Sequence, residues 1–293
     1  MKKNVLVVGS GGREHAMVWA LVNDDKVGNV ICAPGNGGTD LISQNIPVNL
    51  ANHQEILRIA NENKIDVTIV GPEGPLADGI VDTFKKEGLK IFGPDSYGAQ
   101  LESSKLFARD LMTEKKINQP LYYACNKREE IESLKAILHL PLVLKADGLA
   151  AGKGVFVCNT EKEYNQALAY IFDRKQSIKA FDRISVEKCL NGEELSVFVV
   201  CDGLSYKVLN TAQDHKRIFD GDEGPNTGGM GAYSPTPISS SDLIDKVKLE
   251  IIEPTLEAMV DRGHPYTGFL YIGLMIVKGV PYVIEFNVRL GDP

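Results

Sequence analysis

A glycine- and lysine-rich stretch at residues 145–155 constrains this chain more than any other feature. It reads Lys-Ala-Asp-Gly-Leu-Ala-Ala-Gly-Lys-Gly-Val, with a strand-like apolar run on each side. Small residues let backbone N–H groups approach phosphate oxygens, and the lysines add positive charge. The spacing is not that of a Walker P-loop, because three residues separate Gly148 from Gly152 and Gly154 replaces the magnesium-binding Ser or Thr. The pattern predicts a strand–loop–strand unit over a polyphosphate, with an ordinary glycine-rich hairpin as the alternative.

Residues 283–290 form a second informative segment, in which apolar and polar side chains alternate. Because side chains alternate between the faces of a strand, Glu285, Asn287 and Arg289 are predicted to share one face. Glu and Asn two residues apart offer oxygen ligands to a hard cation such as Mg²⁺, and the arginine suits a phosphate or carboxylate. A half-buried strand with a solvated polar face is the alternative.

Composition excludes several classes of protein. The chain has 293 residues, 43% apolar and 24% charged, which is typical of a soluble globular protein with two or three domains. A net charge of −7 argues against nucleic-acid binding, and no apolar run is long enough for a membrane span. The five cysteines are scattered without metal-site spacing, which predicts core residues of a cytoplasmic protein.

The first 102 residues alternate strand and helix signals, which predicts a doubly wound parallel-sheet domain. Ligands of such domains bind beyond the carboxyl ends of the strands. The first of these loops, residues 9–15, lacks a dinucleotide fingerprint because Glu14 stands at the third glycine position. It is therefore expected to offer free N–H groups at a helix start to a single phosphate.

The rest of the chain contains fewer regular signals. Residues 97–115 are predicted to form one long helix, and residues 123–192 a compact domain that carries the glycine-rich loop. Residues 213–235 show no helix or strand pattern, and a loop of that length in a compact domain is usually functional. A long amphipathic helix is predicted at 242–262, followed by a hairpin over 269–290.

Eight runs occur in a fixed order: Gly9–Ala16, Ala33–Asn36, Val70–Glu73, Lys145–Gly154, Gln213–Arg217, Gly224–Pro235, Tyr266–Tyr271 and Glu285–Asn287. Together they resemble the ATP-grasp ligases, and closely the phosphoribosylamine–glycine ligase (glycinamide ribonucleotide synthetase) family. The resemblance implies an N-terminal α/β substrate domain (1–102), an ATP-grasp core (103–122 and 193–293) and a lid domain (123–192). Because the resembled enzymes continue beyond Pro293, the core is expected to be truncated before a C-terminal domain.

The resemblance also implies roles for individual residues. Glu187 is expected near the adenine amine, and Glu194, rather than Glu193, on the ribose hydroxyls. The expected nucleotide contacts are Lys105, Lys145, Gly148, Gly152, Lys153, Gly154, Glu187, Leu190 and Glu194. The expected substrate contacts are Gly11, Gly12, Arg13, Glu73, Asn226, Gly228 and Gly229. The expected catalytic residues are Asp214, Lys216 (or Arg217) and Arg289, and the expected metal ligands are Glu285 and Asn287.

The activity implied is ATP-dependent joining of glycine to 5-phosphoribosylamine through glycyl phosphate, with Mg²⁺ or Mn²⁺, in a monomer or weak dimer. Such chemistry needs positioning, charge neutralisation and exclusion of water rather than a protein nucleophile. Two alternatives stay open. One is another purine-pathway ATP-grasp enzyme, a carboxyphosphate-forming carboxylase. The other is a nucleotide-binding fragment without activity of its own.

Overall fold

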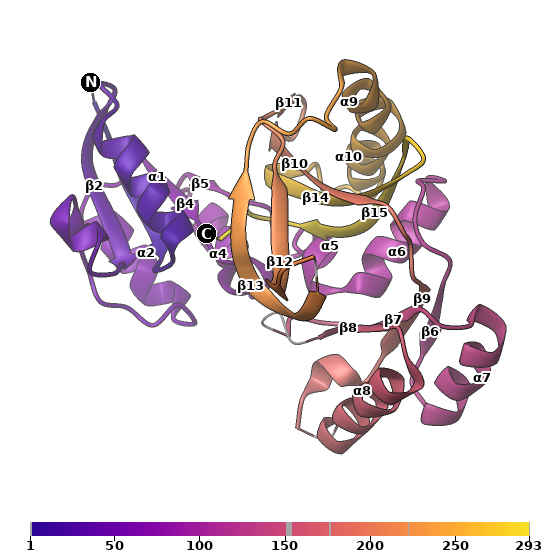
Figure 1. Ribbon diagram of the computed structural model, residues 1–293. Helices are drawn as coiled ribbons and strands as arrows, with labels where there is room; N and C mark the ends of the chain where they lie inside the picture. Colours follow the sequence, from indigo (N-terminus) through magenta and orange to yellow (C-terminus); the bar gives the residue numbers. More distant parts are fainter. Residues whose placement is uncertain (1, 151–153, 176, 222, 293) are drawn as a thin grey trace.

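The computed structural model describes residues 2–150, 154–175, 177–221 and 223–292 (Figure 1). Three units are visible: an N-terminal domain, a lid built around residues 122–188, and a core that contains the last strands. The N-terminal domain and the core share one continuous cluster of buried apolar side chains, which includes Leu6 and Val8 from the first and Leu195 and Val197 from the second. The lid has an apolar cluster of its own. Within the described residues, no helix has the length and apolar character needed to cross a membrane.

The N-terminal domain contains a five-stranded parallel sheet with the order β3-β2-β1-β4-β5, which confirms the doubly wound prediction. Its strands are β1 (Lys3–Gly9), β2 (Val27–Pro34), β3 (Gln44–Asn45), β4 (Val67–Val70) and β5 (Ile91–Phe92). Its helices are α1 (Gly12–Val22), η1 (Thr39–Leu41), α2 (His53–Glu62), α3 (Glu73–Ala77) and α4 (Ile80–Lys86). The strand order reverses between β1 and β4, so the loops that precede α1 and α3 open at the switch point where such sheets bind ligands.

The expected single helix over residues 97–115 is wrong. The structure has α5 (Gln100–Ser103) and α6 (Lys105–Glu114), separated by Ser104 in an extended conformation (φ −134°, ψ 110°). The Ser104 hydroxyl accepts a hydrogen bond from Phe107 N at 3.1 Å and caps α6. The break leaves α6 with a new N-terminus beside the lid.

The lid is a four-stranded antiparallel sheet with the order β6-β9-β7-β8. Its elements are β6 (Tyr122–Cys125), α7 (Arg128–Leu138), β7 (Leu142–Ala146), β8 (Val155–Cys158), α8 (Glu161–Arg174), η2 (Lys179–Phe181) and β9 (Ile184–Lys188). Leu142 and Leu144 of β7 pack with apolar side chains of α7 and α8. Because strand side chains alternate, Lys145 and, on β9, Glu187 lie on the opposite face.

The core sheet is antiparallel in the order β11-β10-β14-β15. Its elements are β10 (Glu193–Asp202), β11 (Tyr206–Val208), α9 (Ser241–Val247), η3 (Lys248–Ile252), α10 (Glu253–Asp261), β14 (Thr267–Val277) and β15 (Val280–Asn287). The predicted helix over 242–262 is therefore present, but it passes through a π-helical turn, η3, just before Pro254. Proline has no N–H for the α-helical ladder, which explains the widened turn.

Two expectations for the core are wrong. Residues 213–235 are not an irregular loop, because β12 (Gln213–Phe219) and β13 (Glu223–Tyr233) pair as an antiparallel ribbon. Strict alternation along 283–290 also fails, but at Ile284, which precedes the three polar residues predicted to share a face. Gly273 pairs with Glu285 and Leu274 with Val283, so Ile284 is an extra residue in a β-bulge. The bulge turns the Ile284 carbonyl toward α6 and the lid, where it accepts hydrogen bonds.

Candidate active site

A cleft of about 180 Å³ lies where α5, α6, the lid and the end of β15 meet. Its size is below the roughly 300–1,000 Å³ of ligand pockets, so it suits part of a nucleotide, such as its phosphates. The cleft brings together seven of the sequence-predicted site residues: Glu73, Lys105, Gly148, Gly154, Glu285, Asn287 and Arg289. These residues are up to 216 positions apart in sequence, as in the Glu73–Arg289 pair.

Two further predicted residues, Lys145 and Glu187, form a buried ionic cluster beside this cleft. The Lys145 ammonium lies 3.0 Å from Glu187 Oε2 and donates to the Ile284 carbonyl at 2.7 Å. Arg109, which the sequence had not suggested, donates from Nε and Nη2 to the two oxygens of Glu187, at 2.9 and 2.7 Å. Lys145, Glu187 and Arg109 are 6%, 1% and 2% exposed.

The pKa values of this cluster reflect its charges. Two cations, Lys145 and Arg109, contact one buried anion, Glu187, and the nearby Glu285 carboxylate is a second anion that acts on Lys145. Burial, together with the nearby Arg109 guanidinium, lowers the pKa of Lys145, although Glu187 opposes the shift. Burial alone would raise the pKa of Glu187, but the charges of Lys145 and Arg109 outweigh it and the pKa is lowered. An anion bound next to Lys145 would favour the charged form of its ammonium, which burial disfavours.

The Glu187 geometry differs from the expected one. Its carboxylate is committed to Arg109, Lys145 and the Ser185 hydroxyl, which donates to Oε1 at 2.9 Å. It is therefore not directed into open space where an adenine amine would lie.

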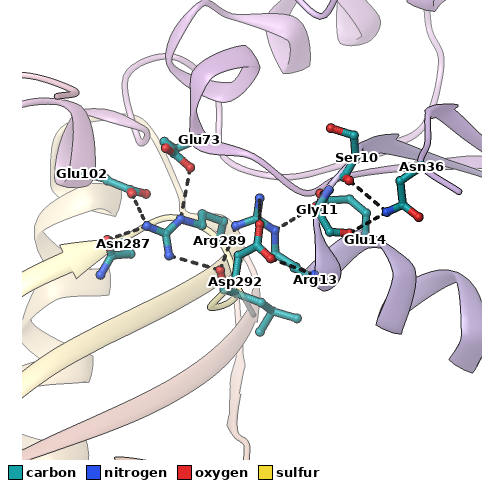
Figure 2. Close-up of polar contacts among 11 residues, drawn as sticks. Ser10, Gly11, Arg13, Glu14, Asn36, Glu73, Glu102, Asn287, Arg289 and Asp292 are labelled. Atoms are coloured by element: carbon teal, nitrogen blue, oxygen red, sulfur yellow. Dashed lines mark hydrogen bonds and ion pairs between the residues drawn. The ribbon is translucent and has the colours of Figure 1, made fainter. Parts of the chain in front are cut away.

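Arg289 lies in a second cluster at the end of β15 (Figure 2). Its guanidinium donates to Glu102 at 2.8 Å, to Asn287 Oδ1 at 3.1 Å and to Glu73 at 3.3 Å. The other Glu102 oxygen accepts from Val288 N at 2.8 Å. Burial raises the pKa of Glu102, and Arg289 opposes the rise. Burial would lower the pKa of Arg289, but Glu102 and Glu73 outweigh it and the pKa is raised.

The predicted metal ligands can be tested against this geometry. Glu285 and Asn287 both line the cleft. Asn287 Oδ1 accepts from Arg289 and, as an amide oxygen, has a second lone pair. No group of three or more His, Cys, Asp or Glu side chains gathers in a metal-binding arrangement within the described ranges. Two oxygen ligands therefore fit a Mg²⁺ that takes its remaining ligands from water and nucleotide phosphates, rather than an all-protein cage.

The loop before α1 is not as open as expected. The prediction of free N–H groups is wrong for two of its residues, because Gly11 N donates to Glu14 Oε2 at 2.6 Å and Arg13 N donates to Asp292 Oδ1 at 3.0 Å. Glu14 reaches back as in a capping box, and the Asp292 carboxylate suits the positive end of the helix. Arg13 also donates to the Leu290 carbonyl at 3.2 Å, which Arg289 shares at 3.2 Å.

The glycine-rich loop is anchored at its first residues. Asp147 Oδ1 accepts from the Ser104 hydroxyl at 2.9 Å and from Leu106 N at 3.1 Å, so a lid residue caps the core helix α6. Gly148 leaves no space for a side chain, since an added Cβ would lie 2.8 Å from the Cβ of Ala180. The predicted contacts Gly152 and Lys153 lie outside the described residues.

Other predicted residues lie away from the cleft lining. Among the residues described, this holds for Leu190 and Glu194, at and just after the lid–core junction, and for Gly12 at the start of α1. Asp214 and Gly229 lie next to each other in the β12–β13 ribbon, with 3.6 Å between Asp214 Oδ1 and the position of an added Gly229 Cβ. The side chains of Lys216 and Asn226, and the surroundings of Gly228, are outside the described part of the chain.

Sequence reasoning missed Arg109, Glu102 and Asp147. One signal was available for Arg109: it stands three residues after Leu106 and three before Met112, on the buried stripe of a helix, where a lone charge needs a partner. Glu102 carries the same signal next to buried Leu101.

The sequence matches two family models. The phosphoribosylglycinamide synthetase N domain covers residues 3–102, and the phosphoribosylglycinamide synthetase ATP-grasp (A) domain covers residues 103–293. A phosphoribosylamine–glycine ligase from Ralstonia nicotianae is 48% identical over 292 residues, which make up 99% of this chain and 69% of that protein. Another, from Clostridium acetobutylicum, is 43% identical over 290 residues, 99% of this chain and 70% of that protein.

Among solved structures, the phosphoribosylamine–glycine ligase from Thermotoga maritima superimposes with a TM-score of 0.84 at 35% identity. The match covers 99% of this chain and 70% of that one. The chain thus spans about 70% of the length of the relatives it matches.

Proposed function

The chain belongs to the phosphoribosylglycinamide synthetase family, and from this premise we propose that it joins glycine to 5-phosphoribosylamine at the expense of ATP. The products are glycinamide ribonucleotide, ADP and phosphate, and the reaction is a step of purine biosynthesis. The observation that carries the proposal is the cleft in which Lys105, Arg289 and the proposed metal ligands Glu285 and Asn287 meet, beside the buried cluster of Lys145, Arg109 and Glu187.

The chemistry proceeds in two displacements. A glycine carboxylate oxygen attacks the γ-phosphorus of ATP; the new O–P bond forms while the bond to the β-phosphate oxygen breaks, and ADP leaves. The 1-amino group of phosphoribosylamine then attacks the acyl carbon of glycyl phosphate, loses a proton and expels phosphate. Activation is needed because hydroxide is a poor leaving group. The protein contributes positioning, charge neutralisation and protection from water.

We assign the phosphates of ATP to Lys105, Lys145 and the loop from Gly148 to Gly154. The Lys145 ammonium is held beside the cleft by Glu187 and by the Ile284 carbonyl. Lys105 lies in the cleft lining at the first residue of α6. When bound on Glu285 and Asn287, Mg²⁺ or Mn²⁺ would neutralise charge that develops on the phosphates.

For the adenosine, we propose backbone contacts at Leu190 and a ribose contact at Glu194. Because the Glu187 carboxylate is occupied, we assign Glu187 the task of holding Lys145 instead of a direct contact with the adenine amine.

The substrates are assigned to the opposite side of the cleft. Glu73 and Arg289 face each other at 3.3 Å across the junction of the N-terminal domain and the core. We propose that Arg289 binds a carboxylate or phosphate and that Glu73 accepts from phosphoribosylamine. A substrate phosphate at the Gly11–Arg13 loop would have to displace the Asp292 carboxylate, since both are anions at one helix start. Asp214, Lys216, Asn226, Gly228 and Gly229 of the ribbon remain proposed substrate contacts.

We place the enzyme in the cytoplasm as a monomer or weak dimer. All five cysteines, each within the described residues, are free, as a reducing compartment would keep them. Burial raises the pKa of Cys158 and of Cys201 to about 12, so these thiols stay protonated and unreactive. Sedimentation of the purified chain at several concentrations tests the oligomeric state.

The activity is tested by ADP release from the 293-residue chain with Mg-ATP, glycine and freshly generated phosphoribosylamine, each omitted in turn. Release that needs both glycine and phosphoribosylamine is expected. Release with bicarbonate in place of glycine would favour the carboxylase alternative. Absence of release, with ATP still raising the melting temperature, would mean that this chain binds nucleotide without completing the reaction.

A further inference from the structure

We propose that Arg109 is a positioning residue that holds the Lys145 ammonium in place for the phosphates of the nucleotide. The inference rests on the proposed function, because it assumes that Lys145 binds those phosphates. Arg109 lies at the edge of the cleft, but it is 2% exposed and its donors are committed to Glu187, Gln119 and two backbone carbonyls, so its part in the reaction would be exerted through Lys145.

Arg109 and Lys145 use the same two acceptors. Lys145 Nζ lies 3.0 Å from Glu187 Oε2 and 2.7 Å from the Ile284 carbonyl oxygen. Arg109 Nη2 lies 2.7 Å from the same Glu187 oxygen and 2.9 Å from the same carbonyl. Both cations thus contact the same pair of oxygens, so a shift of these oxygens would move the ammonium.

Two further donors of Arg109 bond groups next to those two oxygens. Nε donates to Glu187 Oε1 at 2.9 Å, which makes the pair bidentate. Nη1 donates to the Val283 carbonyl at 3.0 Å. Glu187 belongs to the lid strand β9, whereas Val283 and Ile284 belong to the core strand β15. One planar guanidinium therefore sets the distance between lid and core at the point where Lys145 contacts Glu187 of the lid and the Ile284 carbonyl of the core.

Only arginine meets this geometry. Its donors lie in a rigid fork, so it can bond both carboxylate oxygens and two consecutive carbonyls at once. A lysine at residue 109 would keep the charge but present its donors from a single nitrogen. The charge of Arg109 also opposes that of Lys145, which favours an incoming anion.

A purely structural ion pair is the competing explanation, and it predicts a different result. If Arg109 only stabilised the fold, its loss would weaken binding of every part of the nucleotide to a similar degree. If Arg109 acts through Lys145, its removal should weaken binding of the phosphates and leave binding of the nucleoside nearly unchanged.

The test compares dissociation constants for Mg-ATP and for adenosine in the wild-type chain, Arg109→Met, Arg109→Lys and Lys145→Met. Arg128→Met is the matched control, because Arg128 is a half-exposed lid arginine that pairs with Glu132 across one helical turn. Calorimetry supplies the constants, and circular dichroism shows which variants are folded.

We expect Arg109→Met to weaken Mg-ATP binding tenfold or more and adenosine binding less than threefold, in the same pattern as Lys145→Met. Arg109→Lys should be intermediate and Arg128→Met unchanged. Equal losses for ATP and adenosine, or full affinity of Arg109→Lys for ATP, would overturn the proposal while leaving the proposed function intact. If Arg109→Met does not fold, the Mg-ATP affinity of Arg109→Lys decides between the two explanations: a reduced affinity supports the proposal and full affinity overturns it. A wild-type chain that binds no ATP would overturn both.

Discussion

Asp147 offers a graded test of how the lid is attached to the core. The Asp147 side chain is 8% exposed. Its carboxylate accepts hydrogen bonds from the Ser104 hydroxyl and from Leu106 N at the start of α6. Asp147→Ala removes both bonds and the charge. An N-cap contributes about 1 kcal/mol and hydrogen bonds to a charged group about 1.5–3 kcal/mol, so we expect a local loss of about 2–3 kcal/mol.

Asp147→Asn should have a much smaller effect. Both hydrogen bonds end on Oδ1, and an asparagine oxygen can still accept both. What is lost is the charge at the N-terminus of α6, about 0.3–1 kcal/mol. The Arg183 contact adds little, because its N–O distance is 3.7 Å and the arginine is 58% exposed.

The assay must report on the lid–core junction. Trp19, the only tryptophan, lies on α1 in the N-terminal domain, so its fluorescence reports on another region. Hydrogen-exchange mass spectrometry on peptides that contain residues 104–110 and 142–150 measures the local opening free energy directly. Equal exchange in Asp147→Ala and the wild type would show that this anchor does not hold the lid. Equal losses in Asp147→Asn and Asp147→Ala would show that charge rather than hydrogen bonding matters.

Three further predictions concern the metal, the arginine cluster and pH. Glu285→Gln should lower kcat about a hundredfold or more, on the scale of metal catalysis, with an unchanged melting temperature; near-full turnover in steady-state assays would remove Glu285 from the metal site. Arg289→Met should lower turnover at least tenfold, which corresponds to about 1.4 kcal/mol of transition-state stabilisation. Glu73→Gln should change the free energy of unfolding by less than about 1 kcal/mol, because the ion pair of Glu73 with Arg289 is partly exposed. A larger loss for Glu73→Gln in urea unfolding would contradict the small contribution expected of this ion pair. The hydrogen bond from Lys3, followed by that from Asn4 N, lowers the pKa of Asp66 below its ordinary 3.8, so its stabilisation is present above that pH and disappears on acidification. Asp66→Asn should therefore be less stable than the wild type at pH 7 and equally stable near pH 2, and a difference that persists in acid would refute this.

Local sequence was enough for those parts of the fold that local physics determines. The run Val5–Val8 reads as a buried parallel strand, and it pairs with a strand on each side. The apolar residues of β7 identify its buried face, which leaves Lys145 on the other. The N-terminal parallel sheet and the ATP-grasp fold that follows it are both confirmed. The individual roles of the site residues remain predictions, although seven of those residues line one cleft.

The misses share a physical cause, because each depends on a partner far along the chain. The break at Ser104 needs Asp147, 43 residues later. The buried charge of Arg109 is balanced by Glu187, 78 residues away, and by a carbonyl 174 residues away. The bulge at Ile284 follows from the register with β14. The β12–β13 ribbon is glycine-rich and polar, so no alternation in its sequence indicates strands.

The central claim is that the carboxylate of glycine becomes activated as an acyl phosphate. It is tested most directly by supplying glycine with ¹⁸O in both carboxylate positions, together with Mg-ATP and phosphoribosylamine, and analysing the released phosphate by mass spectrometry. If glycyl phosphate forms, the oxygen that attacked the γ-phosphorus stays with it, and each phosphate carries one ¹⁸O. Product formed with unlabelled phosphate would contradict the acyl phosphate route and the assignment of the cleft to it.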